Sequence, residues 1–268
     1  MAPLLTVAGR DVLFAHWPVD HDALAARLPE SLVPATFDGS GWVSVLALEN
    51  EAVGVGSRVR RSPLFGGVPQ LNLRTYVKPD EGDGGDGGRH DDGDDVGASS
   101  DVGVYFLSLD TGRWAAAAAA RRSFGLPFHH ASMRLTRQDD RVTFRSRRRN
   151  AAAKPAVFQA RYRPVGPSFQ ANPGTVERFC VEQFRYYVPA AEDSRLGVLG
   201  DRKRADSVRI GRVTHDPWEL QPVEATLREN TLFEAVDLPT PTAEPVVHYS
   251  PGFEMGVERL EPWDVGSE

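Results

Sequence analysis

Short apolar runs separated by turn-forming residues recur along most of the chain. The runs VLFAHWPV, WVSVLALE and VGVYFLSLD are nearly continuously apolar, a pattern typical of strands that are buried on both faces. Turn residues stand between the runs, for example Asp-Gly-Ser-Gly at 38–41. Many short strands with few helices predict a mainly β fold, either an antiparallel barrel or a sandwich. Because no repeat or linker interrupts the pattern, we predict a single domain over residues 1–268.

The segment LNLRTYV at 71–77 predicts a strand with two different faces. Alternation places polar and apolar side chains on opposite sides, with Asn72, Arg74 and Tyr76 against Leu71, Leu73, Thr75 and Val77. If the apolar side packs outward under a helix, the polar side lines an interior. A buried arginine must then meet a carboxylate or a ligand anion. Glu182, in the apolar context FCVEQF, is the best internal partner, so a structural Arg74–Glu182 bridge and an anion site remain equally open.

Helical patterns are few. In residues 20–32, two capping aspartates precede three leucines at helical spacing, and a proline between the second and third leucine breaks the regular pattern. These residues are Asp20, Asp22, Leu24, Leu28, Pro29 and Leu32. The alanine-rich segment 113–123 has very high helix propensity. The segment ERFCVEQFRYYVP at 177–189 fits a helix or a strand, and both remain open.

Two segments are strongly charged. Residues 79–101 are rich in glycine and acidic residues, which predicts a disordered loop; the spacing of a calcium loop is absent. Residues 132–149 predict a hairpin around a Gln-Asp-Asp turn. Its seven arginines are Arg134, Arg137, Arg141, Arg145, Arg147, Arg148 and Arg149. We expect this basic strand face to pair with acidic loops, and an anionic ligand is the alternative.

Composition and charge exclude several classes of function. Hydrophobic residues make up 41% of the chain, and the net charge of −6 argues against nucleic-acid binding. No apolar run approaches the roughly 20 residues of a membrane span, and the N-terminus lacks the features of a signal peptide. We therefore expect a cytoplasmic protein with no membrane partner. The single cysteine, Cys180, excludes an internal disulfide and a multi-cysteine metal site.

Standard catalytic motifs are absent, and the seven histidines show no metal-ligand spacing. We therefore expect neither a cofactor nor a metal. On a strand the adjacent His129 and His130 would point to opposite faces, so they do not easily share one metal ion. The segments at 215–218 and 248–252 either rim a pocket through His215 and His248 or serve as structural turns.

An ordered set of segments carries a family resemblance over nearly the whole chain. In order, they are HWPVDHDALAARLPESL, FDGSGWVSV, LNLRTYV, GVYFLSLD, ARRSFGLPFHHA, HDPWEL and VHYSPGF. This array resembles the uncharacterised family DUF2071, or YqjF-like, which is similar in fold to acetoacetate decarboxylase. The resemblance implies an acetoacetate-decarboxylase-like antiparallel β-barrel with a central cavity, and frequently a homo-oligomer.

The same resemblance argues against the decarboxylase mechanism. Acetoacetate decarboxylases form a Schiff base between a keto acid and a lysine, which follows a Phe/Trp-Pro element and belongs to a Lys-Lys pair. The matching element here continues into Phe128-His129, and none of the three lysines of the chain lies nearby in sequence. The acidic residue that usually opens the family's Glu-Leu-Asn-x-Arg-Thr-Tyr-Val motif is Gln70, which cannot act as a general base.

The resemblance and the residues together locate a site. The expected cavity is lined by Gln70, Asn72, Arg74 and Tyr76, with His129 near the former lysine position and Glu182 or His215 close by. The leading hypothesis is binding of, or non-Schiff-base chemistry on, a small carboxylate or other anionic metabolite. Arg74 would hold the anion and His129 would be the acid/base, with His130 as a packing residue. Two alternatives are a non-catalytic sensing or interaction barrel, and a metal-dependent lyase or hydrolase using His129 with Glu182 or His215.

Overall fold

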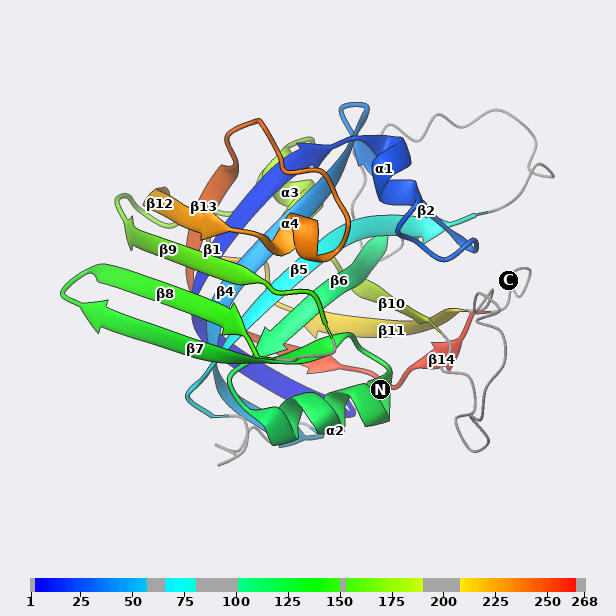
Figure 1. The fold of residues 1–268 in the computed structure, drawn as a ribbon, viewed down its shortest axis with the longest axis horizontal. Helices are drawn as coiled ribbons and strands as arrows, with labels where there is room; N and C mark the ends of the chain where they lie inside the picture. Colours follow the sequence, from blue (N-terminus) through cyan, green and yellow to red (C-terminus); the bar gives the residue numbers. More distant parts are fainter. Residues whose placement is uncertain (1–2, 57–65, 81–100, 150–152, 190–207, 264–268) are drawn as a thin grey trace.

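A computed structural model describes residues 3–56, 66–80, 101–149, 153–189 and 208–263 (Figure 1). The strands are β1 Leu5–Val19, β2 Leu32–Pro34, β3 Thr36–Phe37, β4 Ser40–Val55, β5 Val68–Pro79, β6 Gly103–Thr111, β7 Phe128–Gln138, β8 Arg141–Arg148, β9 Val157–Pro164, β10 Arg185–Pro189, β11 Val208–His215, β12 Val223–Asn230, β13 Val246–Val257 and β14 Glu261–Pro262. The helices of the described part are α1 His21–Ala25, α2 Trp114–Phe124, α3 Val176–Val181 and α4 Leu232–Ala235. The predicted mainly β class is confirmed.

The strand pairings of the larger sheet close on themselves. β5 pairs with β4 and with β6, β6 pairs with β10, and the path returns through β11, β13 and β1 to β4. Most neighbours in this ring are antiparallel, as predicted. β6 differs, because it pairs in parallel with β10 at one end and with β7 at the other. The second parallel pairing is possible because α2 carries the chain back between β6 and β7.

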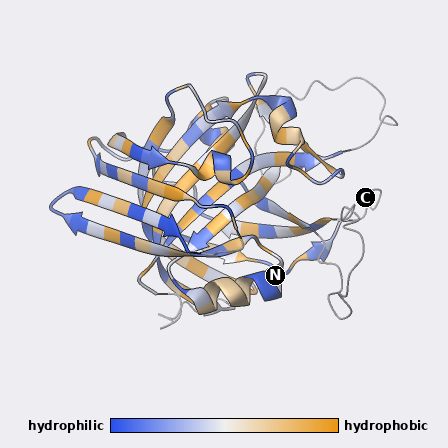
Figure 2. Cartoon of the chain, viewed as in Figure 1, coloured by the Kyte–Doolittle hydropathy of each residue, from blue (hydrophilic) through white to orange (hydrophobic). Residues whose placement is uncertain are grey.

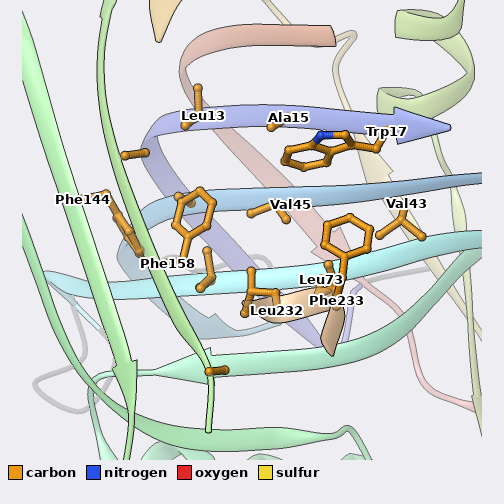
Figure 3. Packing of buried hydrophobic residues seen from close by; sticks show 14 of the residues in the cluster. Leu13, Ala15, Trp17, Val43, Val45, Leu73, Phe144, Phe158, Leu232 and Phe233 are labelled. Carbon is orange, nitrogen blue, oxygen red and sulfur yellow. The ribbon is translucent and has the colours of Figure 1, made fainter. Parts of the chain in front are cut away.

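A second sheet covers one side of the ring. From β6 the pairing continues through β7, β8 and β9 to β12, and these strands lie over β1, β4 and β5 (Figure 1). The largest apolar cluster fills the space between the two layers (Figure 3). In it Trp17 of β1 meets Phe233 of α4 edge-on, and Phe144 of β8 meets Phe158 of β9. The apolar side of β5 is therefore covered mainly by strands, and not by the helix considered from the sequence.

The opposite side of β1, β4 and β5 faces the ring interior, where α3 packs against it. One interior cluster joins residues of β4, β5, β6 and β10 to Phe179 and Cys180 of α3. A second joins residues of β1 and β4 to Val181 at the end of the same helix. The Thr175 hydroxyl caps α3 by accepting from the amide of Arg178. The segment at 177–189 is thus helix first and strand second.

Asp11 ties the ring to the covering sheet. It sits at a register shift of β1 with a positive φ of 52°, where the strand bulges. Its carboxylate accepts from Arg137 of β7 and from the Tyr249 hydroxyl of β13. Its backbone carbonyl accepts from the Tyr162 hydroxyl of β9. Three strands outside β1 are therefore anchored at one irregular residue.

Most of the other elements follow the sequence pattern. The hairpin at 132–149 and the alanine-rich helix are confirmed, and the alternation of the hairpin is visible in Figure 2. The predicted helix over 20–32 is wrong beyond its first turns, because α1 ends at Ala25 and Leu32 belongs to β2. Pro29 prevents the helix from continuing to Leu32. The expected disorder at 79–101 falls largely on residues 81–100, which lie outside the described residues.

Shortening one core side chain tests the packing between the layers. Phe158 is fully buried, so we expect Phe158→Ala to lower the free energy of unfolding by about 3–5 kcal/mol. The matched control is Phe169→Ala, at a site 38% exposed, which should cost about 1 kcal/mol or less. Urea unfolding followed by fluorescence measures both. Equal losses in the two variants would contradict the described core.

Candidate functional site

A row of polar side chains crosses the inner face of the ring. His16 of β1 stands opposite Ser44 of β4, and Ser44 stands opposite Arg74 of β5. Tyr76 lies two residues further along β5, on the same face. All four residues are buried. The strand register therefore brings a histidine, a serine, an arginine and a tyrosine together beneath α3.

These side chains form one hydrogen-bonded chain that ends on the backbone of α3. His16 Nδ1 lies 2.6 Å from Ser44 Oγ, and Ser44 Oγ lies 2.5 Å from the Tyr76 hydroxyl. The Tyr76 hydroxyl donates to the carbonyl of Cys180 at 2.8 Å, and Arg74 Nη2 donates to the same oxygen at 2.7 Å. Burial raises the pKa of the Tyr76 hydroxyl, so this group remains a donor at neutral pH.

The Arg74–Glu182 bridge considered from the sequence is not formed. Glu182 Oε1 accepts from the backbone amide of Trp218, and its Oε2 lies 4.0 Å from Nδ1 of His215. Among the described residues no carboxylate oxygen lies within 4.0 Å of the Arg74 guanidinium, and its Nε has no hydrogen-bond partner. The guanidinium is therefore buried against a neutral carbonyl and the Tyr76 ring, whose centroid lies 5.8 Å from Cζ, although a buried cation is costly without a counter-charge.

Other buried polar atoms on the inner face are also without partners. They are His16 Nε2, Glu182 Oε2, Gln183 Oε1 and His248 Nδ1. Burial lowers the pKa of His16 well below its usual value, and the positive charge of Arg74 lowers it further. Burial also lowers the pKa of His248, while Glu177, 3.8 Å from its Nε2, acts in the opposite sense. Both rings are thus neutral at pH 7.

The amides expected to line the cavity bond to one another. Asn50 Nδ2 donates to Gln70 Oε1 at 2.6 Å, and Gln70 Nε2 donates to Asn72 Oδ1 at 2.8 Å. Gln70, Asn72, Arg74 and Tyr76 alternate along β5, so they share its inner face as predicted. Gln70 and Asn72 continue the polar row and hold each other in place.

His215 lies at the edge of this interior, beside Glu182. Its ring stacks on Phe184 with centroids 4.7 Å apart and planes at 8°. Nε2 lies 3.2 Å from the carbonyl of Gln183, and Nδ1 lies 2.9 Å from the carbonyl of Asp216. The ring is therefore positioned by stacking on Phe184 and lies between two backbone carbonyls.

His129 lies in a different place, in a pocket of about 410 Å³ at the change of neighbour along β6. β6 pairs with β10 up to Tyr105 and with β7 only from Leu109. In the described part of the chain, this edge of β6 has no strand partner between these two residues. We call this space the side pocket. Its polar lining side chains are Arg27, Tyr105, His129, Arg148, Lys154 and Tyr187.

Charge near His129 is mostly positive. Arg148 is buried and pairs with Asp110, whose Oδ1 lies 2.9 Å from its Nη2. Burial first, and then Arg148 and Arg121, lower the pKa of His129 to about 4. The ring is therefore neutral at pH 7 and can accept a hydrogen bond or a proton.

The structure does not bring His129 and Arg74 together. His129 stands next to Asp110, and Asp110 stands next to Leu71, which points to the outer face of β5. Phe106 and Leu126 separate the two places, because both line the side pocket and also pack on the interior cluster. The single cavity expected from the sequence is thus an interior polar row and a side pocket that share a wall.

The structure separates His129 and His130 as predicted, since both lie in β7 and point to opposite faces. His129 is also separate from Glu182 and His215, which do not line the side pocket. The metal-dependent alternative is therefore not supported as it was formulated. Over the described ranges no group of three or more His, Cys, Asp or Glu side chains is placed to hold a metal ion.

Within those ranges no helix has the length and apolar character to span a membrane.

Sequence comparisons identify the family of the chain. The profile of the DUF2071 family, described as an uncharacterized conserved protein, matches residues 7–254. The uncharacterized protein YqjF of Bacillus subtilis (strain 168) is 30% identical over 256 residues, which cover 94% of this chain and 90% of YqjF. This chain belongs to the DUF2071 family. The resemblance inferred from the ordered segments is confirmed.

Solved structures place the DUF2071 chain among acetoacetate-decarboxylase-like folds. The acetoacetate decarboxylase of Legionella pneumophila superposes with a TM-score of 0.56 at 11% identity, covering 98% of this chain and 87% of that one. The enduracididine biosynthesis enzyme MppR, complexed with pyruvate, superposes with a TM-score of 0.59 at 11% identity, covering 100% and 93%. At this identity the likeness shows the fold alone.

Sequence reasoning about this DUF2071 protein missed two interior residues. His16 and Ser44 belong to the interior row, yet each stands in an apolar strand that looked purely structural. His248, considered from the sequence as a residue at the rim of a pocket, is buried beside the same row. One signal was available, because a histidine inside the apolar run VLFAHWPV requires a polar partner when it is buried. The identity of that partner depends on strand register, which the local pattern does not contain.

The lowered histidine pKa values predict acid sensitivity. His16, His129 and His248 stay neutral in the folded chain, whereas the unfolded chain protonates near pH 6.5. The contribution of these histidines to the free energy of unfolding is therefore complete above about pH 6.5. It is lost as the pH falls below that value, by up to ~1.4 kcal/mol per pH unit for each histidine. The raised pKa of Asp110 has the opposite effect, because it increases the free energy of unfolding as the pH falls.

Urea unfolding at pH 7.5, 6.0 and 5.0 measures this dependence. His16→Asn should reduce the change of the free energy of unfolding with pH by the contribution of one histidine. The substitution His21→Asn, at an exposed site, should leave that pH dependence as in the wild type. A slope unchanged by His16→Asn would show that this ring is not held neutral.

The buried ion pair at the side pocket gives a second prediction. Arg148→Met leaves Asp110 buried without its cation, so we expect a loss of about 3–5 kcal/mol in the free energy of unfolding. The neighbouring exposed Arg147→Met is the matched control and should change stability by about 0.5 kcal/mol or less. If both variants lost the same free energy, the pair would have no special structural role.

Proposed function

We propose that this DUF2071 protein binds a small carboxylate in the ring interior, with Arg74 as the group that holds the anion. The observation that carries the proposal is the buried Arg74 guanidinium, whose hydrogen-bond contact is a neutral carbonyl and whose Nε is unpartnered. Charge-assisted hydrogen bonds from arginine to a carboxylate are among the stronger polar contacts in proteins. A bound anion would supply the counter-charge that the described residues do not.

The fold neighbours are consistent with this ligand class. MppR has been solved with pyruvate, and other neighbours are acetoacetate decarboxylases, so small keto acids are reasonable first probes. Schiff-base chemistry is not part of the proposal, because Phe128 and His129 occupy the positions that match the lysine pair. If the chain is an enzyme, its chemistry is lyase-like and does not pass through a Schiff base.

The side pocket is the entrance in this proposal. It is open to solvent, contains basic side chains, and is separated from the interior by Phe106 and Leu126. An acid/base role for His129 applies to a ligand in this pocket, since Arg74 lies on the other side of the wall. The lowered pKa of His129 gives it the neutral state that a general base requires at pH 7.

A non-catalytic sensing role is the second candidate function. It is favoured by the hydrogen bonds that Gln70 makes to Asn50 and Asn72, because a position that matches a decarboxylase acid is here part of an amide network. Binding without turnover in the experiment below would select this role. Cytoplasmic location and a homo-oligomer remain predictions from the sequence and the family resemblance.

A ligand screen with paired variants tests the proposal. Thermal shift and calorimetry with pyruvate, acetoacetate and simple carboxylates should show at least one ligand whose affinity falls about 10- to 100-fold in Arg74→Gln. Arg134→Gln removes an exposed arginine of β7 and should leave that affinity unchanged. If binding is identical in wild type and Arg74→Gln for every anion, the interior site is wrong.

A second pair of variants separates the interior from the side pocket. His129→Gln should reduce turnover or the association rate if the ligand passes through the side pocket, whereas His130→Gln points to the other face and is the control. Loss of affinity in His129→Gln with no effect of Arg74→Gln would move the binding site to the side pocket.

A further inference from the structure

The interior hydrogen-bond chain has a single consistent assignment of donors. A carbonyl oxygen cannot donate, so the Tyr76 hydroxyl gives its one proton to the Cys180 carbonyl at 2.8 Å. The Tyr76 oxygen then accepts from the Ser44 hydroxyl at 2.5 Å. Ser44 has no second proton, so its oxygen accepts from Nδ1 of His16 at 2.6 Å.

This direction determines the tautomer of His16. Nδ1 carries the proton, so Nε2 of the neutral ring carries a lone pair. Nε2 is buried and has no hydrogen-bond partner. An acceptor without a partner in a buried site costs free energy, because it has lost its water and gained nothing in return. His16 therefore offers an unfilled acceptor to the ring interior.

An unfilled donor lies in the same row. Arg74 Nε carries a hydrogen and is also without a partner, and Ser44 stands between Arg74 and His16 in the strand register. Among the described residues, His248 of β13 also lowers the pKa of His16, and the Cys180 thiol of α3 packs in the same interior cluster as Tyr76. Burial raises the pKa of that thiol to about 12, so it stays protonated.

We propose that His16 Nε2 accepts a hydrogen bond from a hydroxyl of the ligand whose carboxylate Arg74 holds, so that the ligand is a small hydroxy acid. Such a molecule has an acceptor for Arg74 Nε and a donor for His16 Nε2, and it satisfies both atoms at once. A simple carboxylate would satisfy Arg74 only. This inference deepens the proposed function and rests on it for the location of the anion.

The tautomer is tested first, without any ligand. Long-range 1H–15N NMR of the full chain at pH 7 should show one histidine with a protonated Nδ1 and an unprotonated Nε2, whose signals disappear in His16→Leu. Ser44→Ala removes the acceptor for Nδ1 and should abolish this fixed tautomer. An Nε2-protonated or doubly protonated His16 in the wild type would overturn the proposal.

Matched ligands test the recognition. Calorimetry with lactate and propionate compares two acids that differ by one hydroxyl, and we expect lactate to bind about tenfold more tightly to the wild type. His16→Leu should reduce this preference to near unity, and His21→Leu, at an exposed histidine, should retain it. Equal binding of both acids to the wild type, or a preference that survives His16→Leu, would overturn the role of His16.

The two levels of the inference fail differently. Binding that depends on Arg74 but ignores the hydroxyl overturns the hydroxy-acid inference and leaves the proposed function standing. Absence of binding by either acid, together with no response of any carboxylate to Arg74→Gln, overturns the interior site itself and the role of His16 with it.

Discussion

One backbone carbonyl inside the ring organises the candidate site. The Cys180 oxygen accepts from Arg74 and from Tyr76, two donors of β5, and thereby holds the end of α3 against the inner face of the strands. Fixing this oxygen determines the direction of every hydrogen bond back to His16, because each hydroxyl has only one proton to donate. It also leaves the charge of Arg74 without a carboxylate among the described residues. The direction of the hydrogen bonds that join His16, Ser44 and Tyr76 follows from this contact.

The change of strand neighbour along β6 places a pocket beside that interior. β6 leaves β10 and joins β7 further along, and the side pocket with His129 lies between the two pairings. Its wall is shared with the interior cluster through Phe106 and Leu126. A ring with one incompletely paired strand thus supplies both a buried polar row and an adjoining pocket, without requiring the wide central cavity that the family resemblance implies.

Local pattern was sufficient for much of the fold and for part of the site. Alternation along β5 correctly put Gln70, Asn72, Arg74 and Tyr76 on one face, and strand geometry separated His129 from His130. Pattern failed where partners came from distant segments. Glu182 lies in an apolar context but bonds to the amide of Trp218, and the contact of Arg74 is a backbone oxygen that no side-chain pattern reveals.

The sequence by itself determined the mainly β class, the family, the loss of the lysine pair and the burial of the polar face of β5, because these depend on residue type and on a period of two. Only the tertiary structure decided that His16 and Ser44 join Arg74, and that His129 does not. The physical reason is register and sidedness. Pairing across β1, β4 and β5 brings His16 into line with Arg74, although the two residues are 58 positions apart in the sequence. Asp110 and His129 are in line with Leu71 instead, which lies on the outer face. A shift of one residue in any of these strands would exchange the two faces and dismantle the site.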